Sequence, residues 1–191
     1  MSETRVLPTL LELPLISRVR RNHALEHATV QVLDERHRGL RLIGRSSTGG
    51  FYIWCNLPTE KVLAAAQEGL RRLQAGQRHM AIHPNCGSNL VVAGVLAGLG
   101  AFLVAEGQRE KPDFSESGAT KTRFLERFMN WLNRLSLACT VATLGVILAR
   151  PLGALFQTHV TTQADVGDLR IVGITRETKI GSVVHRIHTE G

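Results

Sequence analysis

Residues 90–105, LVVAGVLAGLGAFLVA, form sixteen consecutive residues without a charged side chain. A second stretch, LSLACTVATLGVILA at residues 135–149, is interrupted only by Ser and Thr. At 1.5 Å per residue the first stretch covers about 24 Å as a helix, and flanking residues extend it toward the ~30 Å of a bilayer core. The two stretches therefore predict a pair of membrane-spanning helices, and a pair of buried core helices is the alternative.

Two further patterns favour the membrane. Neither stretch has a polar stripe that would face water. Both stretches carry small residues at four-residue spacing, Gly94 and Gly98 in the first and Ala138 and Ala142 in the second. Such spacing lets helix backbones approach closely in lipid. We expect a transmembrane hairpin whose helices pack along these small residues.

The distribution of charge predicts the orientation of this hairpin. Residues 1–87 contain twelve Lys and Arg against seven Asp and Glu, whereas residues 106–127 contain five of each. Positive residues accumulate on the cytoplasmic side of membranes. We therefore expect both termini in the cytoplasm and the polar connector, residues 107–128, on the outside.

The overall charge of +7 and the pI near 10.2 indicate an anionic partner. Aromatic residues make up only 5% of the chain, which argues against base stacking and nucleic acid. An anionic lipid leaflet accounts for the basic residues instead. The three cysteines are widely spaced, odd in number and predict no disulfide framework.

The remaining segments read as a small α+β unit. Residues 14–37 have good helix formers, residues 40–57 read as a β-hairpin, and a second helix runs from Thr59 to about Ala75. The tail offers two strands, residues 169–175 and 182–188, which we expect to complete the sheet.

The fold class that follows is α+β, a small cytoplasmic helix and hairpin unit with an inserted two-helix transmembrane hairpin. Its predicted parts are a cytoplasmic region at residues 1–87, the hairpin at residues 88–150 and a cytoplasmic tail with a β-hairpin at residues 151–191. Within the hairpin the helices are expected at about 88–106 and 130–150.

The first predicted helix contains NHALEHAT, residues 22–29, in which His23, Glu26 and His27 follow the pattern H-x-x-E-H. At 100° per residue these three residues share a stripe of about 100° with three aliphatic residues, Ile16, Val19 and Val30. The trio therefore lies on a covered face, where a carboxylate needs a partner. A metal ion is one solution, and a hydrogen-bond network of Glu with His or Arg is another.

Histidines four residues apart can bind one ion, and Glu26 on the same face can act as a general base. The pattern resembles the H-x-x-E-H signature of the inverted zinc peptidases. That resemblance implies His23 and His27 as zinc ligands and Glu26 as the catalytic residue. In those enzymes the third ligand is a downstream glutamate, but Glu106 would lie on the far side of the membrane here.

A nearer source of ligands is AIHPNCGSN at residues 81–89, which presents His83 and Cys86 in a turn before the first apolar stretch. His83 would complete a three-histidine site, and Cys86 would close it as a fourth ligand. Alternatively, His83 is a hydrogen-bonded turn residue, and Cys86 is a nucleophile or a small buried side chain.

Four segments together resemble an uncharacterised family of small bacterial membrane proteins that has a domain of unknown function. These are RNHALEHATVQVL (21–33), GRSSTGGFYIW (44–54), AIHPNCGSNLVVAGVLAGL (81–99) and RPLGALFQ (150–157). The resemblance implies a bacterial inner-membrane protein and suggests that the two polar motifs form one site. It implies no activity.

Two functions are compatible with these patterns. One is a zinc site at the cytoplasmic membrane surface with the activity of a peptidase-like hydrolase, whose substrate would be a peptide or a membrane protein. The other is a non-enzymatic membrane subunit in which the His and Glu cluster is structural. The sequence specifies neither the metal, the reaction nor the oligomeric state.

Overall fold

A computed structural model describes residues 10–107, 120–179 and 182–191. The chain divides into two compact units. The first combines Met1–Pro84 with Ala154–Gly191, and the second is Asn85–Gly153. The second unit is thus inserted into the sequence of the first.

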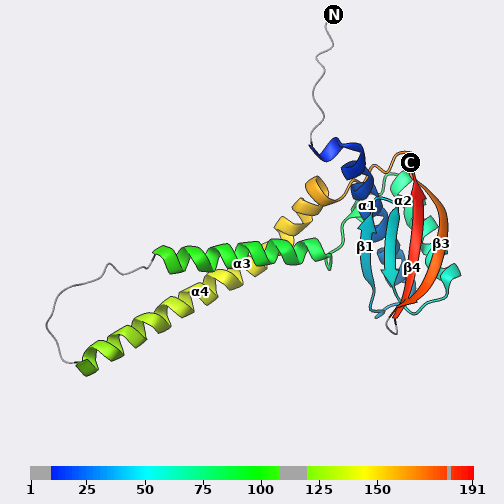
Figure 1. Ribbon diagram of the computed structural model, residues 1–191. Coiled ribbons are helices and arrows are strands. Elements are labelled where there is room, and N and C mark those ends of the chain that lie inside the picture. Colours follow the sequence, from blue (N-terminus) through cyan, green and yellow to red (C-terminus); the bar gives the residue numbers. More distant parts are fainter. Residues whose placement is uncertain (1–9, 108–119, 180–181) are drawn as a thin grey trace, which may run out of the picture. The chain divides into compact units, whose positions relative to one another are not determined.

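The first unit is built on a four-stranded antiparallel sheet (Figure 1). Its strands are β1 (Ile43–Ser47), β2 (Gly50–Trp54), β3 (Arg170–Lys179) and β4 (Ser182–Glu190), in the order β1-β2-β4-β3. Phe51 of β2 pairs with Ile187 of β4, so the tail strands complete the sheet that the first hairpin begins. The expectation that the tail joins this sheet is confirmed.

Two helices, α1 (Pro14–Arg36) and α2 (Thr59–Gln74), cover one face of the sheet (Figure 1). Proline suits the first turn of α1 because that position needs no N–H donor. Short 3₁₀ turns lie at η1 (Leu10–Glu12) and η2 (Arg78–Ala81). A Cβ on Gly69 of α2 would lie 3.1 Å from the Cβ of Ala28, so glycine permits α1 and α2 to pack closely.

The core lies between this helix pair and the sheet. Its largest fully buried apolar side chains come from α1, β2, η2, β4 and the segment before β3, namely Leu25, Leu33, Ile53, Phe51, Met80, Leu169 and Ile187. Along β2, buried residues that face the helices alternate with partly exposed residues on the other face, as expected for a sheet covered on one side. Packing against this core fixes the position of α1 in the first unit.

The second unit contains α3 (Gly87–Gly107) and most of α4 (Thr120–Phe156). Within the described part of the chain, two helices are long and apolar enough to cross a membrane, Gly87–Gly107 and Phe124–Thr161. The α+β class with two apolar helices that could form a hairpin is confirmed. Of the expected connector, residues 108–119 lie outside the described residues.

Three details differ from the sequence expectations. Helix α4 begins at Thr120 rather than near residue 130 and continues through Pro151, which is inside the helix. It is followed by a π-helical turn, η3 (Gln157–Thr161), which the sequence did not indicate.

The expected contact at Gly94 and Gly98 is wrong. Apart from the neighbouring residues of α3 itself, no described atom lies within 4 Å of a Cβ at either position. The helices instead approach at Gly100, beside Val141, and at Gly145, beside Leu96 and Ala97.

Candidate metal centre

Helix α1 buries several polar side chains on the face that the sequence analysis singled out. Glu26 is 6% exposed, His27 is 2% exposed and Asn22 is completely buried. Helical periodicity places the polar residues one turn apart, so they line one side of the helix. Each of them needs a partner in the folded unit.

The His27 ring is held by the 3₁₀ turn η2. Its Nδ1 lies 2.7 Å from the Ala81 carbonyl oxygen. Because a carbonyl can only accept, Nδ1 carries the proton and Nε2 of the neutral ring presents its lone pair. Nε2 is buried and has no hydrogen-bond partner among the residues that the structure describes.

His23 is oriented in the same way from the other side. Its Nδ1 lies 2.9 Å from the carbonyl oxygen of Thr161, in the π-helical turn η3. The neutral His23 ring therefore also carries its lone pair on Nε2. The His23 and His27 ring centroids are 4.3 Å apart, as expected for histidines one helical turn apart.

His83 is the third imidazole of the group, with its ring centroid 5.9 Å from that of His27. Burial lowers the pKa of His83, and the neighbouring His27 lowers it further. The main chain of His83 is hydrogen-bonded to the side chain of Gln157. The lowered pKa favours the neutral form of the ring, which is the form that binds a metal.

Glu26 lies between β1 and His23. Its carboxylate accepts a hydrogen bond from the Ser46 hydroxyl. A Cβ on Gly44 would overlap the carboxylate, so glycine makes the space for it. Burial raises the pKa of Glu26. The Ser46 hydrogen bond, and the positive charge that His23 carries when its ring is protonated, partly oppose the rise.

Cys86 follows Pro84 by two residues, at the start of the second unit. The predicted ligands His23, His27 and His83 belong to the first unit, whereas Cys86 belongs to the second. Within the second unit, the Cys86 sulfur lies 3.1 Å from the Ser88 hydroxyl.

Buried Gln157 was missed in the sequence analysis. The side-chain amide of Gln157 forms hydrogen bonds with both main-chain groups of His83. Its Oε1 accepts from the His83 N–H at 2.9 Å, and its Nε2 donates to the His83 carbonyl oxygen at 3.1 Å. Gln157 is separated from His83 by 74 residues, and no local pattern signals the pairing. The only hint is its place at the end of RPLGALFQ, one of the segments that carried the family resemblance.

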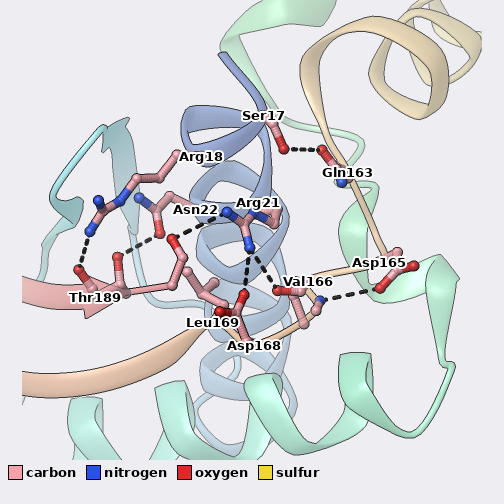
Figure 2. Close-up of polar contacts among 12 residues, drawn as sticks. Ser17, Arg18, Arg21, Asn22, Gln163, Asp165, Val166, Asp168, Leu169 and Thr189 are labelled. Atoms are coloured by element: carbon pink, nitrogen blue, oxygen red, sulfur yellow. Dashed lines mark hydrogen bonds and ion pairs between the residues drawn. The ribbon is translucent and has the colours of Figure 1, made fainter. Parts of the chain in front are cut away.

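Figure 2 shows how the first half of α1 is fastened to the end of the chain. Arg18 donates to the Thr189 carbonyl oxygen at 3.1 Å, and the Thr189 hydroxyl donates to Asn22 at 2.7 Å. Arg21 pairs with Asp168 at 3.1 Å and also donates to the Val166 carbonyl. Arg18 and Arg21 thus fasten α1 within the first unit.

The model of the domain of unknown function DUF6391 matches residues 18–174. The chain belongs to this family. The match includes every residue of the candidate centre, from His23 to Gln157, so the centre belongs to the DUF6391 domain. The family match confirms the resemblance to a family with a domain of unknown function, and it indicates no activity.

An uncharacterised protein of Picosynechococcus sp. strain PCC 7002 is 37% identical over 111 residues. The aligned stretch is 51% of this chain and 53% of that protein, so it spans about half of the relative's length. No solved structure matches the chain.

Proposed function

We propose that this DUF6391 chain is a membrane-anchored zinc protein with a hydrolytic centre at the cytoplasmic surface of the bacterial inner membrane. His23, His27 and His83 would be the zinc ligands, and Cys86 would be a fourth ligand or a neighbour. Glu26 would be the general base, and the substrate class would be a peptide or a membrane protein.

The observation that carries this proposal is the buried Nε2 of His27. A buried polar atom without a partner is rare in folded proteins. Here Nδ1 is fixed by the Ala81 carbonyl, which is the arrangement that orients metal-binding histidines in known sites. His23 has the same Nδ1 bond to a main-chain carbonyl, so two lone pairs are prepared in the same way.

The donor set suits zinc. Neutral imidazole and thiolate are preferred zinc ligands, and three histidines with one further position are typical of catalytic sites. Zinc bound there would supply Lewis acidity. Glu26 would take a proton from water, and its raised pKa brings it closer to the range in which a general base works.

The membrane part of the proposal rests on α3 and on chain connectivity. His83 precedes Gly87, the first residue of α3, by only four residues. A chain of that length spans at most about 14 Å. If α3 crosses the bilayer, the centre therefore lies near the membrane surface, and the basic residues of 1–87 favour the cytoplasmic side.

Zinc content tests the proposal. Purified wild-type protein is expected to contain about one zinc per chain by elemental analysis, and His27→Ala is expected to lose it. His79→Ala is the matched control, because His79 is exposed and lies four residues from His83. Folded, stable wild-type protein that takes up no zinc would overturn the proposal.

The hydrolytic part is tested separately with Glu26→Gln. This variant is expected to retain zinc and to lose cleavage of a fluorescence-quenched peptide library. A non-enzymatic metal site is the second candidate, and the contact of Glu26 with Ser46 favours it, since that contact gives the carboxylate a structural partner. Zinc-loaded wild type without turnover on any peptide of the library supports this second candidate.

A further inference from the structure

A single buried amide joins the places where the chain enters and leaves the apolar hairpin. Gln157 directly follows Phe156, the last residue of α4, and its side chain is completely buried. His83 lies just before α3, which begins at Gly87. The two hydrogen bonds between Gln157 and His83 therefore connect segments that are 74 residues apart in the sequence.

The geometry of this pair restrains the direction of the His83 side chain. The Gln157 amide accepts a hydrogen bond from the His83 N–H at 2.9 Å and donates one to the His83 carbonyl oxygen at 3.1 Å. The peptide planes on both sides of the His83 Cα are thereby fixed, and with them the direction of its Cβ. Among the standard side chains, only Asn and Gln offer a neutral amide that both accepts and donates in this way.

The turn that carries Gln157 also supports a second histidine. The main-chain oxygen of Gln157 accepts bonds from both the N–H and the hydroxyl of Thr162, each at 2.9 Å. One residue before Thr162, the Thr161 carbonyl oxygen accepts a hydrogen bond from Nδ1–H of His23. The π-helical turn η3 thus orients His23 through Thr161 and His83 through Gln157. Such turns are frequent at functional sites.

We infer that Gln157 is a positioning residue of the metal centre, and that through it the two ends of the apolar hairpin must be held together for tight zinc binding. The inference rests on the proposed zinc site and adds a form of regulation to it. Groups that orient metal ligands typically change metal affinity about 10- to 100-fold when they are removed. Coupling is reciprocal, so zinc should also hold the Gln157 turn against His83.

The test compares Gln157→Met with Gln163→Met in the full-length protein. Methionine matches the length of glutamine but forms neither bond to His83. Gln163 is a suitable control because, among the described residues, its side-chain amide accepts a hydrogen bond only from the Ser17 hydroxyl in the first turn of α1. Zinc Kd, measured by chelator competition, is expected to rise about 10- to 100-fold in Gln157→Met and to stay within about twofold in the control.

A double-mutant cycle separates positioning from general loss of structure. If Gln157 acts through His83, Gln157→Met should have little further effect on zinc Kd in a His83→Ala background. Equal loss in both backgrounds would overturn the inference. Should Gln157→Met not fold, Gln157→Glu keeps the size and the acceptor for the His83 N–H, removes the donor at neutral pH and is expected to weaken zinc binding as well.

Hydrogen exchange tests the coupling itself. Zinc is expected to slow amide exchange in peptides covering 154–162 of the wild type, and not in Gln157→Met. Zinc binding that is equally tight in wild type and both Gln157 variants contradicts the inference but leaves the zinc site intact. Failure of the wild type to bind zinc contradicts the proposed function instead.

Discussion

Helices α1 and α3 differ in which side chains they bury and which they expose. Helix α1 buries Asn22, Glu26 and His27 inside the first unit. Helix α3 has no buried residue, and several of its large apolar side chains, such as Val95, are more than half exposed. Each helix therefore places side chains where water-soluble proteins rarely place them.

The comparison leads us to propose a partner outside the protein chain for each helix. The buried Nε2 of His27 has no hydrogen-bond partner among the described residues, and a metal ion would provide one. A helix that is apolar on all sides is stabilised by other helices or by lipid. The proposed zinc ion and the proposed bilayer answer these two requirements separately, so each can be tested alone.

The largest expected effect is on α3. Lysine in place of Val95, near the middle of the helix, should disfavour membrane insertion by about 2.5–3.5 kcal/mol. We expect Val95→Lys to lower the fraction of protein that stays in membranes after an alkaline wash. Leu15→Lys is the control, since Leu15 is 70% exposed against 58% for Val95 but belongs to α1, and it should leave that fraction unchanged. Wild type in the soluble fraction would contradict the membrane assignment.

A smaller effect is expected where α1 meets β1. The methyl group of Gly44→Ala would overlap the Glu26 carboxylate, which must then leave Ser46. Crowding of this kind typically costs about 1–3 kcal/mol of unfolding free energy. Zinc should stay bound, because the histidines are not displaced, whereas peptide cleavage should fall.

Gly173→Ala on β3 provides the control for that substitution, since a Cβ there meets no described atom within 4 Å. Chemical denaturation and zinc analysis of both variants check the prediction. Equal stability of the two variants would show that Glu26 does not depend on the space at Gly44.

The same contrast explains how much the sequence could predict. Periodicity within one segment indicates which residues share a face, so the apolar hairpin and the stripe of His23, Glu26 and His27 could be inferred. The bonds that complete the centre join distant segments, as between Gln157 and His83, and leave no local pattern. Pro151 shows the converse, because α4 continues through a residue that locally favours a break.

The smallest expected effect concerns His185, which is fully buried on β4 and outside the proposed centre. Burial lowers its pKa below the ordinary value of 6.5. The unfolded chain therefore binds more protons than the folded one, and unfolding free energy should fall as pH drops through about 6.5. One such group contributes a slope of at most about 1.4 kcal/mol per pH unit.

His185→Gln should flatten this slope relative to wild type. Denaturation curves between pH 5 and pH 8, with a chelator present to exclude metal-linked protons, provide the comparison. Parallel pH profiles of the two proteins would contradict the assignment. Glu26 acts in the opposite direction, because its raised pKa lets the folded chain bind the extra proton, and the difference between the two profiles removes its contribution.

The most direct test of the central claim is nitrogen NMR of protein labelled with ¹⁵N-histidine. The claim is that His23 and His27 carry their protons on Nδ1 and offer Nε2 to zinc. Without metal, both residues should show the Nδ1–H tautomer, and stoichiometric zinc should shift the Nε2 resonances to values typical of metal-bound imidazole. Nε2 resonances that do not move with zinc, in a protein that remains folded, would contradict the account.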